Sequence, residues 1–96
     1  TELFADSSEL VRFGIADRQV GSAQLAEWRR REPPLPPGRR LFDTRVMAVG
    51  LDAAVVTTLF DYPGQTWVGR QSQTWQRTDS GWRIVHAHVS AVAQHA

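Results

Sequence analysis

Polar and apolar residues alternate most regularly in the last third of the chain, where two strands are predicted. The segments 71–77 and 82–90 are rich in Thr, Val, Ile and Trp, the residue types favoured in strands. Between them lies Asp79-Ser80-Gly81, a typical turn sequence. We expect a three-residue loop with Gly81 at positive φ, because glycine adopts this conformation without steric cost.

The register of this hairpin decides which side chains share a face, because successive side chains of a strand point to opposite sides. In the preferred register Trp75 faces Val85, while Gln73 and Gln71 share its face and oppose Ala87 and Val89. The other face then carries Ile84, His86 and His88. A two-residue turn at Asp79-Ser80 would instead place the histidines opposite the two glutamines, since a one-residue slip exchanges the faces.

The upstream pattern predicts one helix and three more strands. The helix is expected over Ala23–Arg31 with Ser22 as its N-cap, and Leu25 and Trp28 lie on one face of it. The strands are expected over residues 10–15, 40–49 and 53–62. Residues 17–21 are predicted to be a turn, residues 33–38 a proline-rich spacer, and residues 1–8 the last turn of a helix leading into the first strand.

These elements predict an α+β fold in a single domain that spans residues 1–96. The order is strand, helix and then four consecutive strands, which favours an antiparallel meander with the helix packed on one face. A chain of 96 residues with 42% hydrophobic and 22% charged residues is of ordinary globular composition.

Composition and charge narrow the classes of function. The chain has no cysteine, so we expect neither disulfides nor thiolate chemistry. A net charge of +1 gives no general attraction to nucleic acid, and no apolar run is long enough for a membrane span. We therefore expect a cytoplasmic protein that binds neither nucleic acid nor membrane and uses no cofactor.

The residue with the most distinctive setting is Arg12, in the apolar sequence LVRFG, because a charge among apolar neighbours is costly unless it is paired. Three interpretations stay open. Arg12 is a clamp for an anion such as a carboxylate, a structural partner of an acid such as Asp43 or Asp61, or a side chain that points to solvent from an edge strand.

Two other groups offer polar side chains. His86 and His88 share a strand face, but a metal site needs a third ligand, and the remaining histidine, His95, lies near the C-terminus. We therefore expect no metal. Gln71 and Gln73 can hydrogen-bond a carbonyl or carboxylate if their face is concave.

Three pieces of sequence carry a resemblance to a known family: LVRFG, the segment VGSAQLAEWRRREP, and VGRQSQTWQRTDSGWRIVHAHVS. Together they resemble the AtzH-like family of the nuclear transport factor 2-like (SnoaL-like) superfamily. The resemblance implies a cone formed by a curved antiparallel sheet wrapped around helices, with a pocket inside. It also implies homodimerisation through the outer sheet face, and we expect the family's first helix to be absent from this chain.

The resemblance also implies an activity, namely a hydrolase of carboxylated ureas that releases allophanate from 1,3-dicarboxyurea. Arg12 takes the catalytic role by holding a substrate carboxylate in the pocket. The expected substrate-binding residues are Trp28, Gln71, Gln73, Trp75 and, if the register slips, His88. Two alternatives stay open: a non-catalytic binding or oligomerisation module, and a SnoaL-like isomerase or cyclase with Asp43 or Asp61 as its acid.

Overall fold

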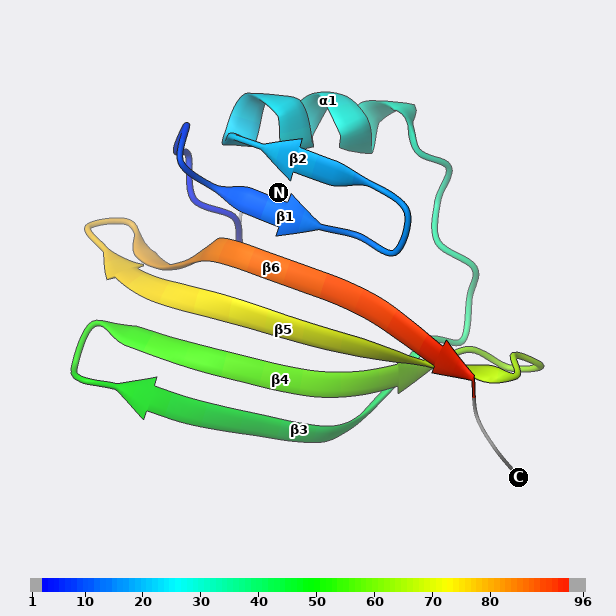
Figure 1. Cartoon of the computed structure of the whole chain (residues 1–96). Coiled ribbons are helices and arrows are strands. Elements are labelled where there is room, and N and C mark those ends of the chain that lie inside the picture. Colours follow the sequence, from blue (N-terminus) through cyan, green and yellow to red (C-terminus); the bar gives the residue numbers. More distant parts are fainter. Residues whose placement is uncertain (1–2, 94–96) are drawn as a thin grey trace.

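The computed structural model describes residues 3–93, which form one helix and a six-stranded sheet. The elements are β1 (Val11–Phe13), β2 (Arg18–Val20), α1 (Ser22–Arg31), β3 (Arg40–Val49), β4 (Ala53–Asp61), β5 (Trp67–Thr78) and β6 (Gly81–Ala93). The strand order is β2-β1-β6-β5-β4-β3 (Figure 1). The four long strands form the predicted antiparallel meander, but β1 pairs with β6 in parallel, so the sheet is mixed rather than wholly antiparallel.

The first part of the chain differs most from the prediction. The predicted turn at residues 17–21 was wrong, because Arg18–Val20 form β2, which pairs antiparallel with β1. The turn comes earlier, where the Gly14 N–H donates to the Asp17 carbonyl at 2.8 Å. Phe4 forms a parallel bridge with Ile84, so no helical turn leads into the sheet here; residues 1 and 2 of that predicted turn lie outside the described residues.

Helix α1 lies where the periodicity placed it, and Leu25 is buried as expected. The predicted N-cap was wrong, because Gly21 occupies the cap position and makes no side-chain cap bond. The Ser22 hydroxyl is used elsewhere: it donates to Asp6 at 3.0 Å and accepts from the Ser7 N–H at 3.1 Å. These bonds fasten the start of α1 to the segment that precedes β1.

The β5–β6 hairpin combines the two registers considered for it. Gly81 has the expected positive φ, at 102°, but pairing starts at Thr78 and Gly81. A register shift then leaves Val85 as an extra residue, so Trp75 faces Ile84 and the predicted Trp75–Val85 pair was wrong. Beyond this bulge the predicted pairs Gln73–Ala87 and Gln71–Val89 are confirmed.

Because of the bulge, Ile84 lies on the opposite face from the one predicted. Ile84 lies on the same side as Trp75 and Ala87 instead of beside the histidines, and it is only 1% exposed. Burial of this side chain explains the bulge, because an extra residue restores the inward direction for Ile84 without moving Ala87.

Two rows of paired residues define the two faces of the sheet. The helix face is the side of α1, and its central row crosses all six strands: Gln19, Arg12, Ala87, Gln73, Val56 and Val46. The outer face is the opposite side, and its central row is Arg18, Phe13, His88, Ser72, Thr57 and Arg45.

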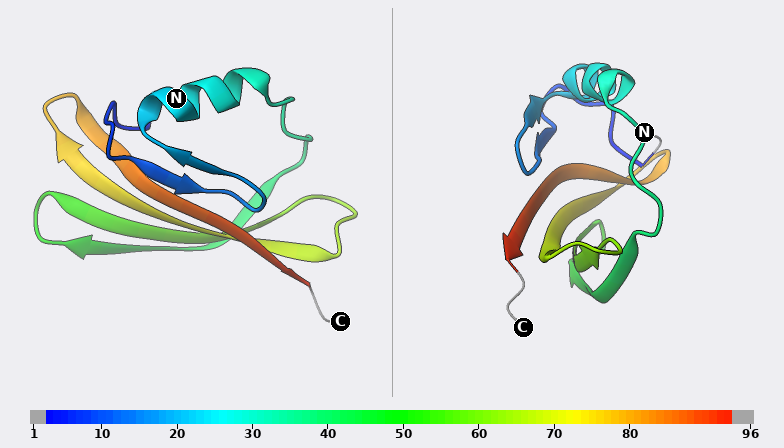
Figure 2. Two further views of the ribbon diagram at one scale, coloured as in Figure 1. Left: turned by 45° about the horizontal axis from the view of Figure 1, so that its top comes forward. Right: turned by 90° about the vertical axis from the view of Figure 1, so that its right-hand side faces the viewer.

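The sheet is strongly curved, and α1 covers only its β1–β2 end (Figure 2). The helix face is therefore open over β3, where Val46 is 70% exposed. The largest fully buried side chains, Leu10 and Ile84, come from the covered end. Within residues 3–93, no helix has the length and apolar character needed to cross a membrane.

Candidate functional site

Arg12 is the centre of a polar network on the helix face. Its Nη1 donates to Asp17 Oδ1 at 2.5 Å and to Gln19 Oε1 at 3.0 Å, and Gln19 Nε2 donates to the same Asp17 oxygen at 3.0 Å. The guanidinium lies over the Trp28 ring, 4.4 Å from its centroid. The Arg12 side chain is 14% exposed and Gln19 is 3% exposed. The charge is thus held by an acid, an amide and an aromatic face.

The network uses only one of the three guanidinium nitrogens. Within residues 3–93, Nε and Nη2 of Arg12 make no hydrogen bond, and no buried side-chain nitrogen or oxygen lacks a partner. These two nitrogens therefore face solvent. An arginine edge with two parallel donors matches the two oxygens of a carboxylate.

Arg12 lies close enough to Arg29 of helix α1 to affect the pKa of that side chain. The pKa of Arg29 lies below its ordinary value, chiefly because the side chain is partly buried and also because Arg12 is close. Arg29 still carries its charge at neutral pH, and its guanidinium lies over the Phe4 ring. The Arg12 guanidinium thus lies over Trp28 and that of Arg29 over Phe4, and Asp17 is the acid bound to Arg12.

Gln73 and Trp75 lie on the same face as Arg12. The Trp75 indole N–H donates to Gln73 Oε1 at 3.1 Å, which leaves the Gln73 amide N–H groups for another acceptor. Ala87 is paired with both Arg12 and Gln73, so it separates them in the row. At about 4.8 Å per strand, the two backbones are roughly 10 Å apart with only a methyl group between them.

The other two predicted binding residues lie apart from this group. Gln71 shares the helix face, but its Oε1 accepts from Arg39 Nη2 at 3.0 Å. His88 pairs with Ser72 and lies on the outer face, opposite to Arg12. The structure therefore brings Arg12, Trp28, Gln73 and Trp75 to one side and places His88 on the other.

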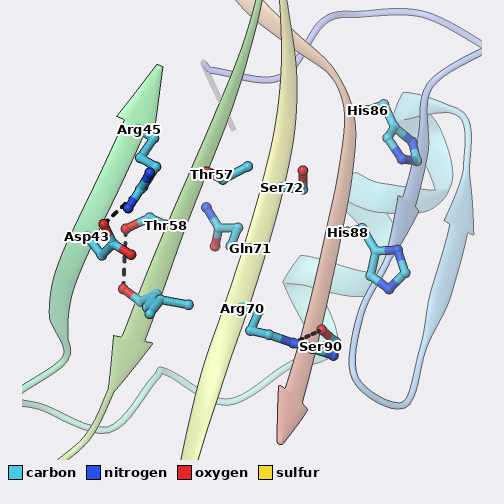
Figure 3. Close-up of a pocket in the computed structure, with 11 residues that line it drawn as sticks. Asp43, Arg45, Thr57, Thr58, Arg70, Gln71, Ser72, His86, His88 and Ser90 are labelled. Carbon is cyan, nitrogen blue, oxygen red and sulfur yellow. Dashed lines mark hydrogen bonds and ion pairs between the residues drawn. The ribbon is translucent and has the colours of Figure 1, made fainter. Parts of the chain in front are cut away.

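The outer face has a hollow of about 430 Å³ across β3 to β6 (Figure 3). Both strand histidines, Arg45, Arg70 and several hydroxyl groups line it. A second hollow, of about 310 Å³, lies between α1 and the segment around Phe4. Neither of these two hollows is lined by Arg12, Trp28, Gln73 or Trp75, so the residues expected to form one pocket lie outside both.

The two acids considered for isomerase chemistry are engaged elsewhere. Asp61 binds Arg40, with Nη2 and Oδ2 2.7 Å apart, and Asp43 binds Arg45 at 3.1 Å. Asp43 lines the outer hollow, and neither acid is the partner of Arg12. Within residues 3–93, no three side chains of His, Cys, Asp or Glu form a group that would hold a metal ion.

Sequence reasoning missed Asp17 and Gln19, the two hydrogen-bond partners of Arg12. The signal was the glycine at position 14, which permits a tight return of the chain after Phe13. A larger residue at position 14 would place its Cβ against the Asp17 carboxylate. A hairpin centred just after Gly14 pairs Phe13 with Arg18 and Arg12 with Gln19, as observed.

A family model described as AtzH-like matches residues 1–95. The chain belongs to the AtzH-like family. Among solved structures, this AtzH-like chain is similar to a cystatin-like fold protein from Burkholderia xenovorans, with 43% identity and a TM-score of 0.91. That match covers 97% of this chain and 74% of the other. No curated protein matches the chain.

Two further structures show how far the AtzH-like fold extends. A protein of unknown function from Pectobacterium atrosepticum is 38% identical with a TM-score of 0.90, over 96% of this chain and 72% of that one. An NTF2-like protein of unknown function from Pseudomonas putida is 20% identical with a TM-score of 0.70, over 93% and 68%. The fold is therefore that of the nuclear transport factor 2-like superfamily, as the sequence predicted.

Proposed function

We propose that this AtzH-like chain is a binding domain that holds a small carboxylate on the helix face, against Arg12. The proposal rests on the surroundings of the Arg12 guanidinium. It is largely buried and fixed by Asp17, yet Nε and Nη2 face solvent. Because its geometry is already set, binding costs little side-chain entropy.

The neighbours of Arg12 suit a small planar anion. The Trp28 ring beside the guanidinium offers an apolar wall, and the free Gln73 amide donates from across Ala87. A ligand that binds Arg12 through one carboxylate, and carries a carbonyl or a second carboxylate at its other end, would reach both Arg12 and the Gln73 amide. Asp17 repels such a ligand, so we expect millimolar rather than nanomolar affinity.

Isothermal titration calorimetry of the full chain with acetate, malonate and succinate tests this proposal. We expect the dicarboxylates to bind best, and Arg12→Gln to weaken binding at least tenfold, the loss expected for one charge-assisted contact. Arg77→Gln, an exposed arginine bound to Asp52 and the Leu51 carbonyl, is the control with the same change of charge.

Arg12→Lys tests whether binding is lost only because the chain unfolds, since lysine keeps the charge but not the paired donors. It should retain the circular dichroism spectrum and bind more weakly than wild type. Equal affinity in the wild type and Arg12→Gln, or no binding to the wild type at 10 mM of each acid, on the order of the weakest specific affinities, would refute the proposal.

A hydrolase of a carboxylated urea is the second candidate, and Asp17 is the observation that favours it. Asp17 is the carboxylate bound to Arg12, so an acid and an anion clamp share one position. In this reaction water adds across the terminal C–N bond of 1,3-dicarboxyurea, which gives allophanate and bicarbonate. Arg12 would hold the carboxylate and Asp17 would take the proton from water.

Incubation of the full chain with 1,3-dicarboxyurea, followed by measurement of allophanate, separates the hydrolase from the binding domain. Turnover above the uncatalysed rate that disappears in Asp17→Asn supports the hydrolase. Binding of dicarboxylates without turnover supports the binding domain alone.

We further propose that two copies associate through the outer face. The support is the set of exposed apolar residues on that side, which are costly to leave in water: Phe13, Met47, Val49 and Val92. Light scattering after size exclusion should give twice the mass of one chain. Val49→Lys should give a single-chain mass, whereas Val46→Lys, on the helix face of the same strand, should not.

A further inference from the structure

A second arginine is fixed on the helix face, at the end of the proline-rich segment. Arg39 Nη2 donates to Gln71 Oε1 at 3.0 Å, and its guanidinium lies over the Phe60 ring, 4.7 Å from the centroid. Gln71 is paired with Thr58, two residues before Phe60 on β4, so Gln71 and Phe60 share the helix face. Arg39 therefore lies on the same side of the sheet as Arg12.

Arg39 keeps donors for a ligand, and it lacks the acid that partly neutralises Arg12. Within residues 3–93, Nε and Nη1 of Arg39 make no hydrogen bond, and no carboxylate forms an ion pair with this side chain. The amide N–H groups of Gln71 also stay available, because only its oxygen is used. An anion near Arg39 thus meets an uncompensated positive charge and a neutral donor.

The neighbouring residues hold Arg39 in this position. Gly38 has a φ of 88°, and a Cβ at this position would come within 2.9 Å of Pro63, so the two residues lie close together. On the other side, Arg40 binds Asp61 with Nη2 and Oδ2 2.7 Å apart. Arg39 is thus flanked by two residues that are held against the end of β4, and ordering it around a ligand costs little entropy.

The distance between the two arginines suits a small elongated anion. Arg12 and Gln73 are both paired with Ala87, and Gln71 lies two residues from Gln73 on β5. At about 4.8 Å between strands and about 3.4 Å per residue, the backbones of Arg12 and Gln71 are about 12 Å apart. Between them β6 presents Ala87 and Val89 to the helix face, and both are apolar.

We propose that Arg39 is a second anion contact of the carboxylate site, and that Arg39 and Gln71 select dicarboxylates long enough to extend from Arg12. One carboxylate of the ligand binds Arg12. The other accepts hydrogen bonds from Arg39 and the Gln71 amide, and the carbon chain between them lies over Ala87 and Val89. This inference rests on the carboxylate site proposed above and adds its selectivity for ligand length.

Ligand length is the property that separates this role from a purely structural one. Malonate has a single carbon between its carboxylates, so it extends from Arg12 toward Gln73 and falls short of Arg39. Each further methylene moves the second carboxylate closer to Arg39. A ligand that reaches Arg39 gains a charge-assisted hydrogen bond, which is worth at least tenfold in affinity.

Calorimetric titration of the full chain with acetate, malonate, succinate, glutarate, adipate and pimelate tests the inference. We expect affinity to rise along the series to a best length beyond malonate, at least tenfold tighter than malonate, and to fall again for longer chains. Arg39→Gln should remove this advantage, so that the best ligand binds no more tightly than malonate. Gln71→Leu, which changes no charge, should reduce the advantage several-fold, because it removes the group that holds Arg39.

Arg40→Gln is the matched control. It makes the same change of charge at the next residue, but Arg40 is bound to Asp61, and the pair lies on the outer face. This variant should keep the length preference. Arg39 is exposed, so Arg39→Gln should keep the circular dichroism spectrum of the wild type.

The possible failures of the two proposals can be told apart. If the wild type binds neither acetate nor any dicarboxylate, the carboxylate site and this inference are both refuted. If binding depends on Arg12 but shows no length preference, or if Arg39→Gln keeps that preference, the inference fails while the carboxylate site stands. Equal effects of Arg39→Gln and Arg40→Gln would also overturn it, because general charge would then explain the result.

Discussion

Arg12 is bound within the fold and still keeps donors free for the ligand proposed above. Its bond to Asp17 compensates a charge on a largely buried side chain, and its remaining donors stay available. These two roles compete, because the carboxylate of Asp17 lowers the net charge that a ligand meets. Removing Asp17 should therefore change stability and affinity in opposite directions.

Asp17→Asn should lower the free energy of unfolding by about 1–3 kcal/mol, the cost of leaving a charged hydrogen-bonding group without its partner. The same variant should bind malonate several-fold more tightly. Chemical denaturation and calorimetry measure the two effects. Asp52→Asn is the control, since Asp52 forms an exposed pair with Arg77 at 3.3 Å and should change neither value by a measurable amount. A variant that loses both stability and affinity would show that Asp17 only positions Arg12.

The sequence identified Arg12 but assigned it the wrong acids. The unusual feature, a charge inside LVRFG, is local and visible in one strand. Of its partners, Gln19 is on β2 and Asp17 directly precedes that strand, and strands of three residues are too short to show alternation. Asp43 and Asp61, the two acids suggested for it, lie within predicted strands, yet each pairs with another arginine.

Gly69 is a second residue with a clear structural reason. Any Cβ at this position would overlap the ring of Phe60, which is paired with it across β4 and β5. Gly69→Ala should destabilise the chain by about 1–3 kcal/mol, because a packed ring must shift. Thermal unfolding measures this loss. Gln76→Ala, exposed on the same strand, should stay within about 0.5 kcal/mol. Combination with Phe60→Leu should recover part of the loss if the ring is its cause.

At the level of elements, the long strands were predictable from the sequence, but the bulge and the pairing of distant strands were not. The bounds of β3 agree with the prediction, and those of β4 differ by one residue, because runs of ten residues rich in strand-forming types give a clear signal. The bulge at Val85 left no local signal, since it arises from burial of Ile84 against the covered end of the sheet. The parallel pairing of β1 with β6 also joins segments more than seventy residues apart in the chain.

Helix α1 allows a prediction of pH dependence. Arg30 hydrogen-bonds Glu27 and lowers the pKa of that carboxyl below its ordinary value, with a smaller contribution from Arg31 at 3.9 Å. A lowered folded-state pKa adds stability above the unfolded value, and this is lost as the pH falls through the folded value. Glu27→Gln should therefore reduce the melting temperature slightly at pH 7, and the difference from wild type should shrink as the pH falls below the ordinary glutamate pKa of about 4.3. A difference that does not shrink on acidification would point to helix propensity instead of charge.

For the whole molecule, the sheet separates two groups of polar side chains with different chemistry. Arg12, Trp28 and Gln73 face α1, whereas Arg70, His86 and His88 face away from it, and Ala87 is buried between the histidines in β6. Sites on opposite faces of a rigid sheet share no ligand contacts, so mutations in one should not affect the other. The sequence indicated this separation through the alternation in β6, once the register beyond the bulge was right.

Arg12→Gln should therefore abolish malonate binding, whereas Arg70→Gln, which makes the same change of charge on the outer face, should leave malonate affinity within about twofold, a change below 0.5 kcal/mol. Calorimetric titration of each variant with malonate measures the two affinities. If malonate binding also falls in Arg70→Gln, the faces are coupled through the strands, and β6 is the element that connects them, because it pairs with both β1 and β5.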